Sequence, residues 1–183
     1  MKILFHLGHP AHFHLFKNSI KSLIEDGHTP LIIINKKDIL EELLINEDFE
    51  YTNILPKGRK DTKLSIAYGL AKQEYQLLKY CLKVKPDLLV GTSVPICHVG
   101  KILSIPSINM NEDDANVVPL FSNLAYPFAD TILSPTSCNN LKWDNKTIKY
   151  PGFSRDIVSF GIVKEIQVSN DQILTYLAGS NHL

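Results

Sequence analysis

The sequence lacks net charge and long hydrophobic runs. Its basic and acidic side chains number 19 each, so nothing global attracts the 183-residue chain to nucleic acid or to an anionic membrane. The longest apolar runs, such as Leu31–Ile34, are far shorter than the roughly 20 residues that span a bilayer. The apolar stretch after Lys2 is also too short for a secretory signal. We therefore expect a cytoplasmic protein.

Cysteine is scarce, and glycine does not occur in the common cofactor motifs. Cys81, Cys97 and Cys138 are odd in number and form no C-x-x-C pair, which predicts buried free thiols instead of a disulfide framework or a zinc knuckle. The turn at residues 8–11 lacks the later glycines of G-x-G-x-x-G, so it is not expected to bind a dinucleotide. No G-x-S-x-G motif surrounds Ser93, which argues against a serine nucleophile.

Short apolar stretches alternate with segments whose apolar residues recur every three or four positions. The stretches predict strands and the periodic segments predict helices. Strands joined by helices of this length pair in parallel through right-handed crossovers, which predicts a doubly wound α/β sheet. The expected strands are residues 2–7, 30–35, 49–55, 88–91, 107–110 and 131–133, and the expected helices are 12–26, 38–44, 64–82, 95–103 and 116–128.

Polar residues gather just after several of the expected strands. In doubly wound sheets, ligands bind outside the carboxyl ends of the strands, where the strand order reverses. That rule selects four segments as candidate site loops, namely residues 8–14, 91–95, 109–116 and 134–137.

The first of these loops is rich in histidine. His6, His9, His12 and His14 could share a metal ion, but no carboxylate lies within ten positions of His12, so we expect no metal site. His12 falls in the first turn of its helix, where the helix dipole favours the neutral imidazole that a general base needs. The alternative is a turn residue hydrogen-bonded to a carbonyl, and the sequence leaves both open.

The third loop, residues 109–116, carries three consecutive acids. Carboxylates at a strand end bind divalent cations or sugar hydroxyls, or they cap the next helix. We expect one residue of this loop to cap the helix and Glu112 to point into the cleft. In the second loop, Ser93 is placed to cap the helix that follows it.

The order of motifs resembles the N-terminal half of GT-B glycosyltransferases, and most closely a group of prokaryotic proteins of unassigned function related to them. The chain opens with a strand and G-x-P-A-H-x-H-x-F at residues 8–16, followed by K-P-D at 85–87. Further on it has I-P-S-I at 105–108, P-x-A-D at 127–130 and Y-P-G at 150–152. The resemblance covers about residues 1–152. It implies a Rossmann-like sheet that forms one GT-B half.

A more distant similarity is to the transferase that adds N-acetylglucosamine to the lipid-linked peptidoglycan precursor. This similarity implies that His12 is the base that deprotonates an acceptor hydroxyl, and that Glu112 also acts in catalysis. The glycines of that enzyme's first turn are replaced here by other residues, His9 among them. We expect the substrate to contact Gly8, His9, His14, Thr92, Ser93, Asn111 and Asn123.

The resemblance also predicts how the chain is divided. Residues 1–152 are expected to form the acceptor-side domain, and residues 153–183 a tail of uncertain structure in which 171–177 suits a short helix. In such enzymes a second Rossmann-like domain holds the nucleotide sugar, and the tail is too short for one. The chain alone is therefore expected to bind no cofactor. It would be a truncated product, or one subunit of a split transferase whose donor domain is a separate chain.

The expected acceptor is a sugar or a lipid-linked glycan, which would bring the protein into peripheral contact with the inner face of the membrane. Two alternatives stay open. The UDP-N-acetylglucosamine 2-epimerases share the two-domain plan, so the chain could be an epimerase fragment. It could also be a non-catalytic binding or assembly module.

Overall fold

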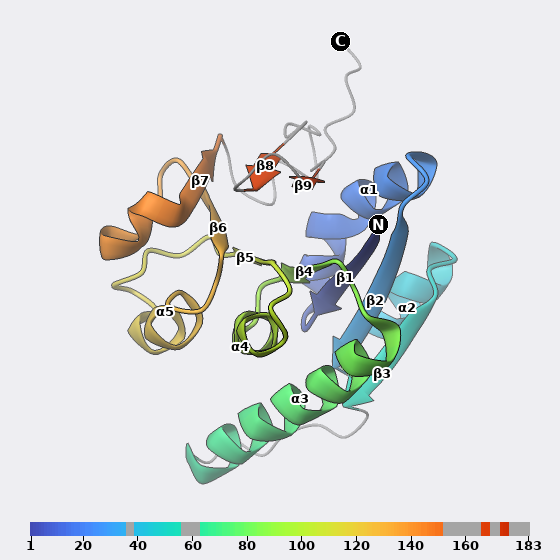
Figure 1. Ribbon diagram of the computed structural model, residues 1–183, viewed down its shortest axis with the longest axis horizontal. Helices are drawn as coiled ribbons and strands as arrows, with labels where there is room; N and C mark the ends of the chain where they lie inside the picture. Colours follow the sequence, from blue (N-terminus) through green and yellow to red (C-terminus); the bar gives the residue numbers. More distant parts are fainter. Residues whose placement is uncertain (36–38, 56–62, 152–165, 169–172, 176–183) are drawn as a thin grey trace.

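The computed structural model describes residues 1–35, 39–55, 63–151, 166–168 and 173–175. Its centre is a seven-stranded parallel sheet in the order β3-β2-β1-β4-β5-β6-β7 (Figure 1). The predicted doubly wound α/β fold is therefore confirmed. The strands are β1 Lys2–Leu7, β2 Thr29–Asn35, β3 Tyr51–Leu55, β4 Leu88–Gly91, β5 Ser107–Met110, β6 Thr131–Pro135 and β7 Thr147–Tyr150.

Helices cover both faces of the sheet. One hydrophobic core lies beneath α1 and α2, and a second lies beneath α3, α4 and α5 (Figure 1). In β1, Phe5 faces the first core and Leu4 the second, which is why this strand is apolar at nearly every position. The helices are α1 Pro10–Glu25, α2 Leu40–Asn46, α3 Lys63–Val84, α4 Val94–Leu103 and α5 Pro119–Ala125, with a 3₁₀ helix η1 at Leu141–Lys146.

The strand order reverses between β1 and β4. From β1 the chain adds β2 and β3 on one side, and α3 then carries it to the other side, where β4 to β7 follow in order. Parallel strands end at the same edge, so the loops after β1, β4 and β5 meet where a ligand site is expected.

Three local expectations differ from the structure. The fifth helix begins at Pro119, later than expected, and no acid caps it, because Val118 is the N-cap and makes no side-chain cap bond. The preceding loop forms a turn instead, in which the carbonyl of Asp114 accepts from the N–H groups of Val117 and Val118. The 3₁₀ helix and β7 were not predicted. In the tail, Ile173–Thr175 is a strand, β9, paired antiparallel with β8 at Ile166–Val168, so the predicted helix is wrong there.

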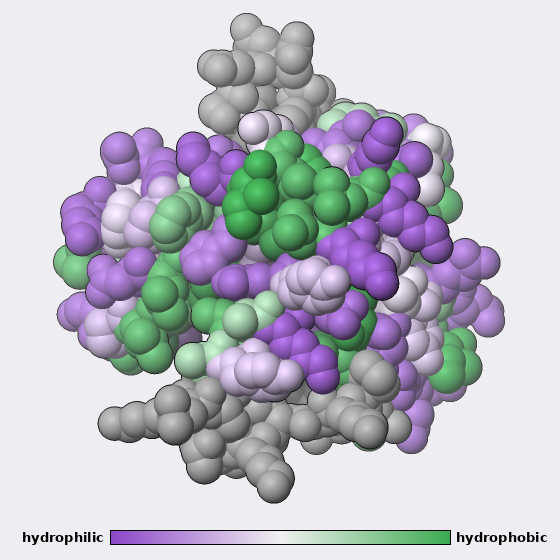
Figure 2. Space-filling model, turned by 60° about the horizontal axis from the view of Figure 1, so that its bottom comes forward, coloured by the Kyte–Doolittle hydropathy of each residue, from purple (hydrophilic) through white to green (hydrophobic). Residues whose placement is uncertain are grey.

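The three cysteines are buried and free, as predicted. Some large apolar side chains lie outside the two cores, and Tyr68, Tyr75 and Leu82 along α3 are each more than half exposed. On the face drawn in Figure 2, a patch of hydrophobic residues is bordered by hydrophilic ones. Among the described helices, none is both long and apolar enough to cross a membrane.

The pairing of β1 with β4 requires a glycine. Gly91 lies opposite His6 in the register of the two strands. A Cβ at Gly91 would lie 2.9 Å from the backbone oxygen of His6, closer than a carbon and a carbonyl oxygen normally approach. A larger residue at this position therefore forces β1 and β4 apart.

We predict that Gly91→Ala lowers the free energy of unfolding by about 1–3 kcal/mol, the usual cost of overpacking a filled core. Urea unfolding followed by circular dichroism measures the change. An unchanged free energy of unfolding would show that β1 and β4 can separate slightly without destabilising the protein.

Candidate functional site

A pocket of about 420 Å³ opens at the carboxyl ends of β1, β4 and β5. Its lining comes from the start of α1, the loops after β4 and β5, and α5. This is the edge where the strand order reverses. The lining residues are Ala11, His12, Leu15, Thr92, Met110, Asn111, Glu112, Asp113, Val118 and Phe121.

His12 lies in the first turn of α1, and the chain around it fixes its ring. His9 is the N-cap of this helix, and its Nδ1 accepts from the N–H of Ala11 at 3.1 Å. The N–H of Gly8 donates to Nδ1 of His12, also at 3.1 Å. Nδ1 therefore carries no proton, so the neutral imidazole of His12 carries its proton on Nε2.

Thr92 holds the His12 ring from the β4 side. Its Oγ1 is 2.9 Å from both Nδ1 and Nε2 of His12. Equal distances to the two nitrogens place this oxygen over the ring, off the in-plane direction of either nitrogen, so Thr92 fixes the ring mainly by contact.

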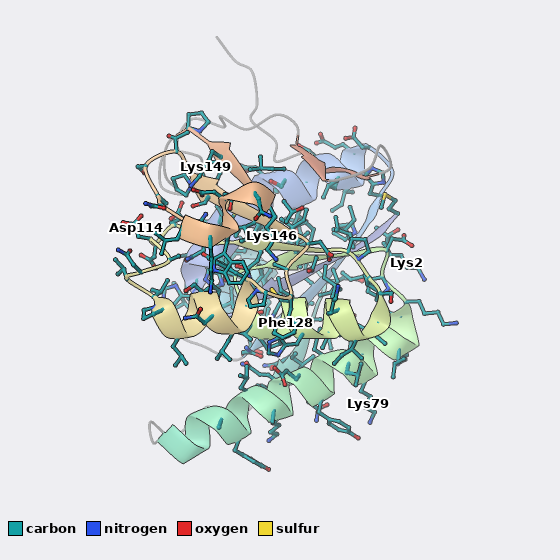
Figure 3. The ribbon with its side chains drawn as sticks, turned by 60° about the vertical axis from the view of Figure 1, so that its left-hand side comes forward. Lys2, Lys79, Asp114, Phe128, Lys146 and Lys149 are labelled. Carbon is teal, nitrogen blue, oxygen red and sulfur yellow. The ribbon has the colours of Figure 1, made fainter. Side chains whose placement is uncertain are left out.

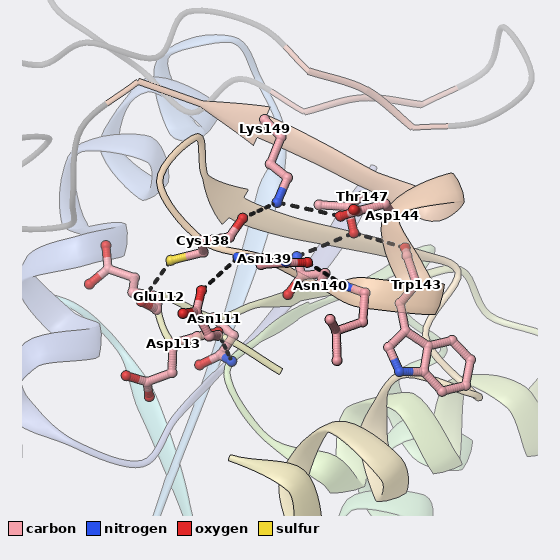
Figure 4. Close-up of polar contacts among 12 residues, drawn as sticks. Asn111, Glu112, Asp113, Cys138, Asn139, Asn140, Trp143, Asp144, Thr147 and Lys149 are labelled. Carbon is pink, nitrogen blue, oxygen red and sulfur yellow. Dashed lines mark hydrogen bonds and ion pairs between the residues drawn. The ribbon is translucent and has the colours of Figure 1, made fainter. Parts of the chain in front are cut away.

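Glu112 lines the pocket, as predicted from its place after β5. Its Oε1 accepts from the hydroxyl of Tyr150 on β7 at 3.1 Å. Its backbone oxygen accepts from the thiol of Cys138 at 2.9 Å (Figure 4). Burial, together with the Glu112 carboxylate, raises the pKa of Tyr150 well above its usual range. Tyr150 therefore stays protonated and remains a donor to Glu112.

The rest of the acidic loop is tied to the surrounding chain. Nδ2 of Asn111 donates to the hydroxyl of Tyr126 at 2.8 Å and to the carbonyl of Asp113 at 3.2 Å. A carboxylate oxygen of Asp114 accepts from the N–H of Asn139 at 2.6 Å. Figure 3 shows Asp114 on the side of the molecule that also carries Lys149, whose Nζ donates to the carbonyl of Cys138 (Figures 3 and 4). The loop is thus fixed before any ligand binds.

A buried polar layer supports the pocket from below. Nδ1 of His6 lies 2.6 Å from Oγ of Ser93, and the Ser93 carbonyl accepts from Nδ2 of Asn109 at 3.2 Å. Ser93 is the N-cap of α4, as predicted, but its hydroxyl makes no cap bond because it faces His6. These bonds fix the turn that carries Thr92 to the His12 ring.

His6 is neutral at physiological pH. Burial lowers its pKa from 6.5 to about 4, and the nearby Asn35 side chain opposes this shift only in part. Nε2 of His6 and Oδ1 of Asn35 are both buried, and neither makes a hydrogen bond within the described part of the chain. Burial is therefore the main reason that a proton on this ring is disfavoured.

This burial predicts a loss of stability in acid. The unfolded chain takes up a proton on His6 below about pH 6.5, but the folded chain does so only near pH 4. The contribution of His6 to the free energy of unfolding is therefore complete above pH 6.5. It decreases by about 3 kcal/mol as the pH drops to about 4. The His6→Gln variant should not show this decrease when urea unfolding is measured across the same pH range, because glutamine does not titrate.

His14→Gln is the matched control, because His14 is exposed on α1. It should keep the wild-type dependence on pH. An equally steep loss in His6→Gln would show that the neutral His6 ring does not cause it.

The structure brings some of the predicted site residues together and separates others. His12, Thr92, Asn111 and Glu112 line one pocket, and Gly8 contacts His12 directly. His9 is exposed beside His12, and their ring centroids are 6.0 Å apart. Ser93 lies below the pocket, where it contacts His6. His14 and Asn123 are exposed and do not line the pocket, and Asn123 donates to the carbonyl of Pro119.

Several contributors to the pocket were not predicted from the sequence, among them Tyr150 and Phe121. Tyr150 was noted only as part of the Y-P-G motif, although its hydroxyl holds Glu112. Phe121 was assigned only to a helix, although its ring lines the pocket. No local pattern marks either residue, because it is the fold that brings Phe121 to the pocket and Tyr150 to Glu112. Among the described residues, no group of three or more histidine, cysteine, aspartate or glutamate side chains could hold a metal ion.

Comparison with known proteins agrees with this fold. A family model described as "Protein of unknown function (DUF354)" matches residues 1–182. No curated protein matches the chain.

Several solved structures resemble it. Staphylococcus aureus MnaA, in a co-structure with UDP, has a TM-score of 0.69 at 14% identity, covering 86% of this chain and 46% of that one. The UDP-GlcNAc 2-epimerase of Methanocaldococcus jannaschii has a TM-score of 0.63 at 18% identity, covering 81% and 45%. Acinetobacter baumannii MurG has a TM-score of 0.63 at 13% identity, covering 85% and 48%.

The chain thus spans less than half the length of each of these three proteins. At such identities the likeness concerns the fold, and it confirms the predicted match to one GT-B half. Because the family model covers nearly the whole sequence, the chain belongs to the DUF354 family.

Proposed function

We propose that this chain is the acceptor-binding half of a GT-B-like glycosyltransferase that acts on a sugar or a lipid-linked glycan. The observation that carries the proposal is that a fixed histidine and a fixed carboxylate, His12 and Glu112, line one pocket at the reversal point of the sheet. A hydroxyl group placed between them meets both a donor and a proton acceptor.

The hydrogen bonds indicate a separate catalytic role for each of the two side chains. The N–H of Gly8 occupies the lone pair on Nδ1 of His12, so the proton of the neutral ring is on Nε2, which can act as a hydrogen-bond donor. Glu112 offers carboxylate oxygens, one of which already accepts from Tyr150. In this arrangement Glu112 takes the proton of the acceptor hydroxyl, and His12 orients its oxygen. The role expected for His12 from the sequence, as base, requires Nδ1 to be released from Gly8.

The nucleotide-sugar donor is assigned to a second domain or to a separate chain. Support for this comes from the extent of the structural match, which covers 46% of MnaA and 48% of MurG. MnaA, whose structure was determined together with UDP, is among the proteins whose fold this chain resembles. The acceptor half alone is expected to be inactive.

We predict that Glu112→Gln lowers the rate of sugar transfer by about 10²–10⁴-fold, the usual contribution of a positioned base. His12→Ala should also reduce transfer, whereas His12→Asn, which keeps an N–H donor, should recover part of the rate. Transfer from UDP-N-acetylglucosamine is measured with the full chain and a donor-domain partner, the first candidate being the product of the neighbouring reading frame.

His14→Ala is the control for this series, because His14 is exposed on the same helix and does not line the pocket. It should transfer at the wild-type rate. If Glu112→Gln stays active while His12→Asn is as inactive as His12→Ala, then His12 is the base. If all of these variants transfer at the wild-type rate, the pocket is not the acceptor site.

A sugar-nucleotide epimerase is the second candidate. It is favoured by the presence of proton-carrying groups from two walls of the pocket, because epimerisation removes a proton from a carbon and returns one on its other face. UDP-GlcNAc 2-epimerases are also among the proteins that share this fold. Incubating the chain and its partner with UDP-N-acetylglucosamine in deuterated water distinguishes the two. Deuterium at a sugar carbon indicates epimerisation, and a new glycosidic product indicates transfer.

A further inference from the structure

Helix α3 carries an apolar strip on its solvent side. Tyr68, Tyr75 and Leu82 are 72%, 63% and 58% exposed, and Ala71 is exposed between the two tyrosines. These four residues, which we call the α3 strip, are three, four and seven positions apart, so they lie on one face of the helix. The strip runs about 21 Å along the helix axis. Its spacing is that of the a and d positions in a coiled-coil seam.

The opposite face of α3 already attaches the helix to the sheet. Leu77 and Cys81 are buried in the second core, and Leu70 and Leu78 pack against that core from its border. The α3 strip is therefore not needed to hold the helix in place. Substitutions in the strip should leave the fold intact.

Lysines border the strip on one side. Lys72 and Lys79 each lie four positions after a tyrosine of the strip, and Lys83 follows Leu82 directly. All three lysines are exposed. Figure 3 shows Lys79 on the side of α3 that is turned away from α4 and α5. An apolar seam with cations along its border favours an anionic partner.

The one acid of α3 does not neutralise these lysines. Glu74 faces α4, where its Oε1 lies 2.5 Å from Nδ1 of His98. Nε2 of the same histidine lies 2.8 Å from the carbonyl oxygen of Leu124, so the ring is fixed between α3 and the end of α5. A chain with equal numbers of basic and acidic residues thus has a locally cationic helix face.

The same lysines disfavour a second copy of this chain as the partner. In an antiparallel pair of α3 helices, the lysine border of one strip lies against the lysine border of the other, and like charges oppose each other. In a parallel pair, the lysines lie against the side that carries Glu74, and that carboxylate already contacts His98.

A membrane surface matches the strip less well than a helix does. Helices that lie on membranes have an apolar face rich in tryptophan, phenylalanine and leucine. The α3 strip has two tyrosines, one alanine and one leucine. It also has the narrow width of a coiled-coil seam, whereas the apolar stripe of other amphipathic helices is broader.

We propose that the α3 strip is a docking site for an acidic amphipathic helix of a partner chain. The apolar seam of that helix packs on the strip, and its carboxylates lie beside the lysine border. The surface is separate from the pocket, because none of the residues that line the pocket belongs to α3. The inference therefore goes beyond the proposed function and does not depend on it.

Two synthetic peptides test the inference. Both consist of three heptads with leucine at the a and d positions, and they carry either glutamate or lysine at all e and g positions. Like charges keep each peptide from pairing with itself, so a gain of helix in circular dichroism reports binding. Each is titrated into the full-length isotope-labelled protein. We expect the acidic peptide to shift the amides of α3 and to bind at least about tenfold more tightly than the basic one.

One substitution in the strip tests the apolar contact. Tyr75→Ala should weaken binding of the acidic peptide at least about fivefold, because it removes an exposed aromatic contact from the centre of the seam. Ile45→Ala is the matched control, because Ile45 is 59% exposed on α2, in the other helix layer. It should bind the acidic peptide as the wild type does.

One charge reversal tests the lysine border. Lys79→Glu should narrow the preference for the acidic peptide about threefold, which is the size expected for a surface ion pair. Lys142→Glu changes the net charge equally at an exposed position on η1, and it should leave the preference unchanged. Equal narrowing in both variants would assign the preference to overall charge and overturn the inference.

The remaining outcomes would also overturn it. One is that the two peptides bind equally well, or that neither shifts the amides of α3. Another is a dimer in light scattering that Tyr75→Ala abolishes, which would make a second copy the occupant. The last is sedimentation with vesicles of phosphatidylglycerol and phosphatidylcholine that Tyr75→Ala abolishes, which would assign the strip to a membrane.

Discussion

The close pairing of β1 with β4 is the contact on which the rest of the structure depends. It sets the place where the strand order reverses, and Gly91 allows it because a Cβ there would approach the His6 carbonyl to 2.9 Å. The same contact brings Ser93 to His6 and Thr92 to His12. The pocket is therefore a consequence of how two buried strands meet, and its polar groups are held from below by the sheet.

Two kinds of polar residue occur at this edge, and the structure gives them different tasks. His6 and Ser93 are bonded to each other beneath the surface, where burial keeps His6 neutral. His12 and Glu112 lie above this layer and line the pocket. Histidines six residues apart thus differ entirely in environment, because strand residues of β1 face the cores and the first turn of α1 faces the ligand edge.

Much of the fold could be predicted from the sequence, and the reason is the parallel sheet itself. Strands buried on both faces are apolar almost throughout, and amphipathic helices separate them, so the order of elements and the site edge are visible in the pattern. The short fifth helix was harder, because the acidic loop suggested a cap, whereas Asp114 instead bonds to the N–H of Asn139, 25 positions away. No local signal reveals such a partner. The same holds for Tyr150, which lies 38 positions after Glu112.

The order of the strands also determines when the site can form during folding. β1 is paired on one side with β2, which follows it closely, and on the other with β4, where Ile3 lies opposite Leu88. During synthesis the second edge of β1 therefore stays open until the chain has passed Gly91. Non-local parallel pairing of this kind is slow, and the exposed edge of a hydrophobic strand can pair wrongly in the meantime. This largely apolar strand therefore depends on the crossover through α3 to cover its second edge.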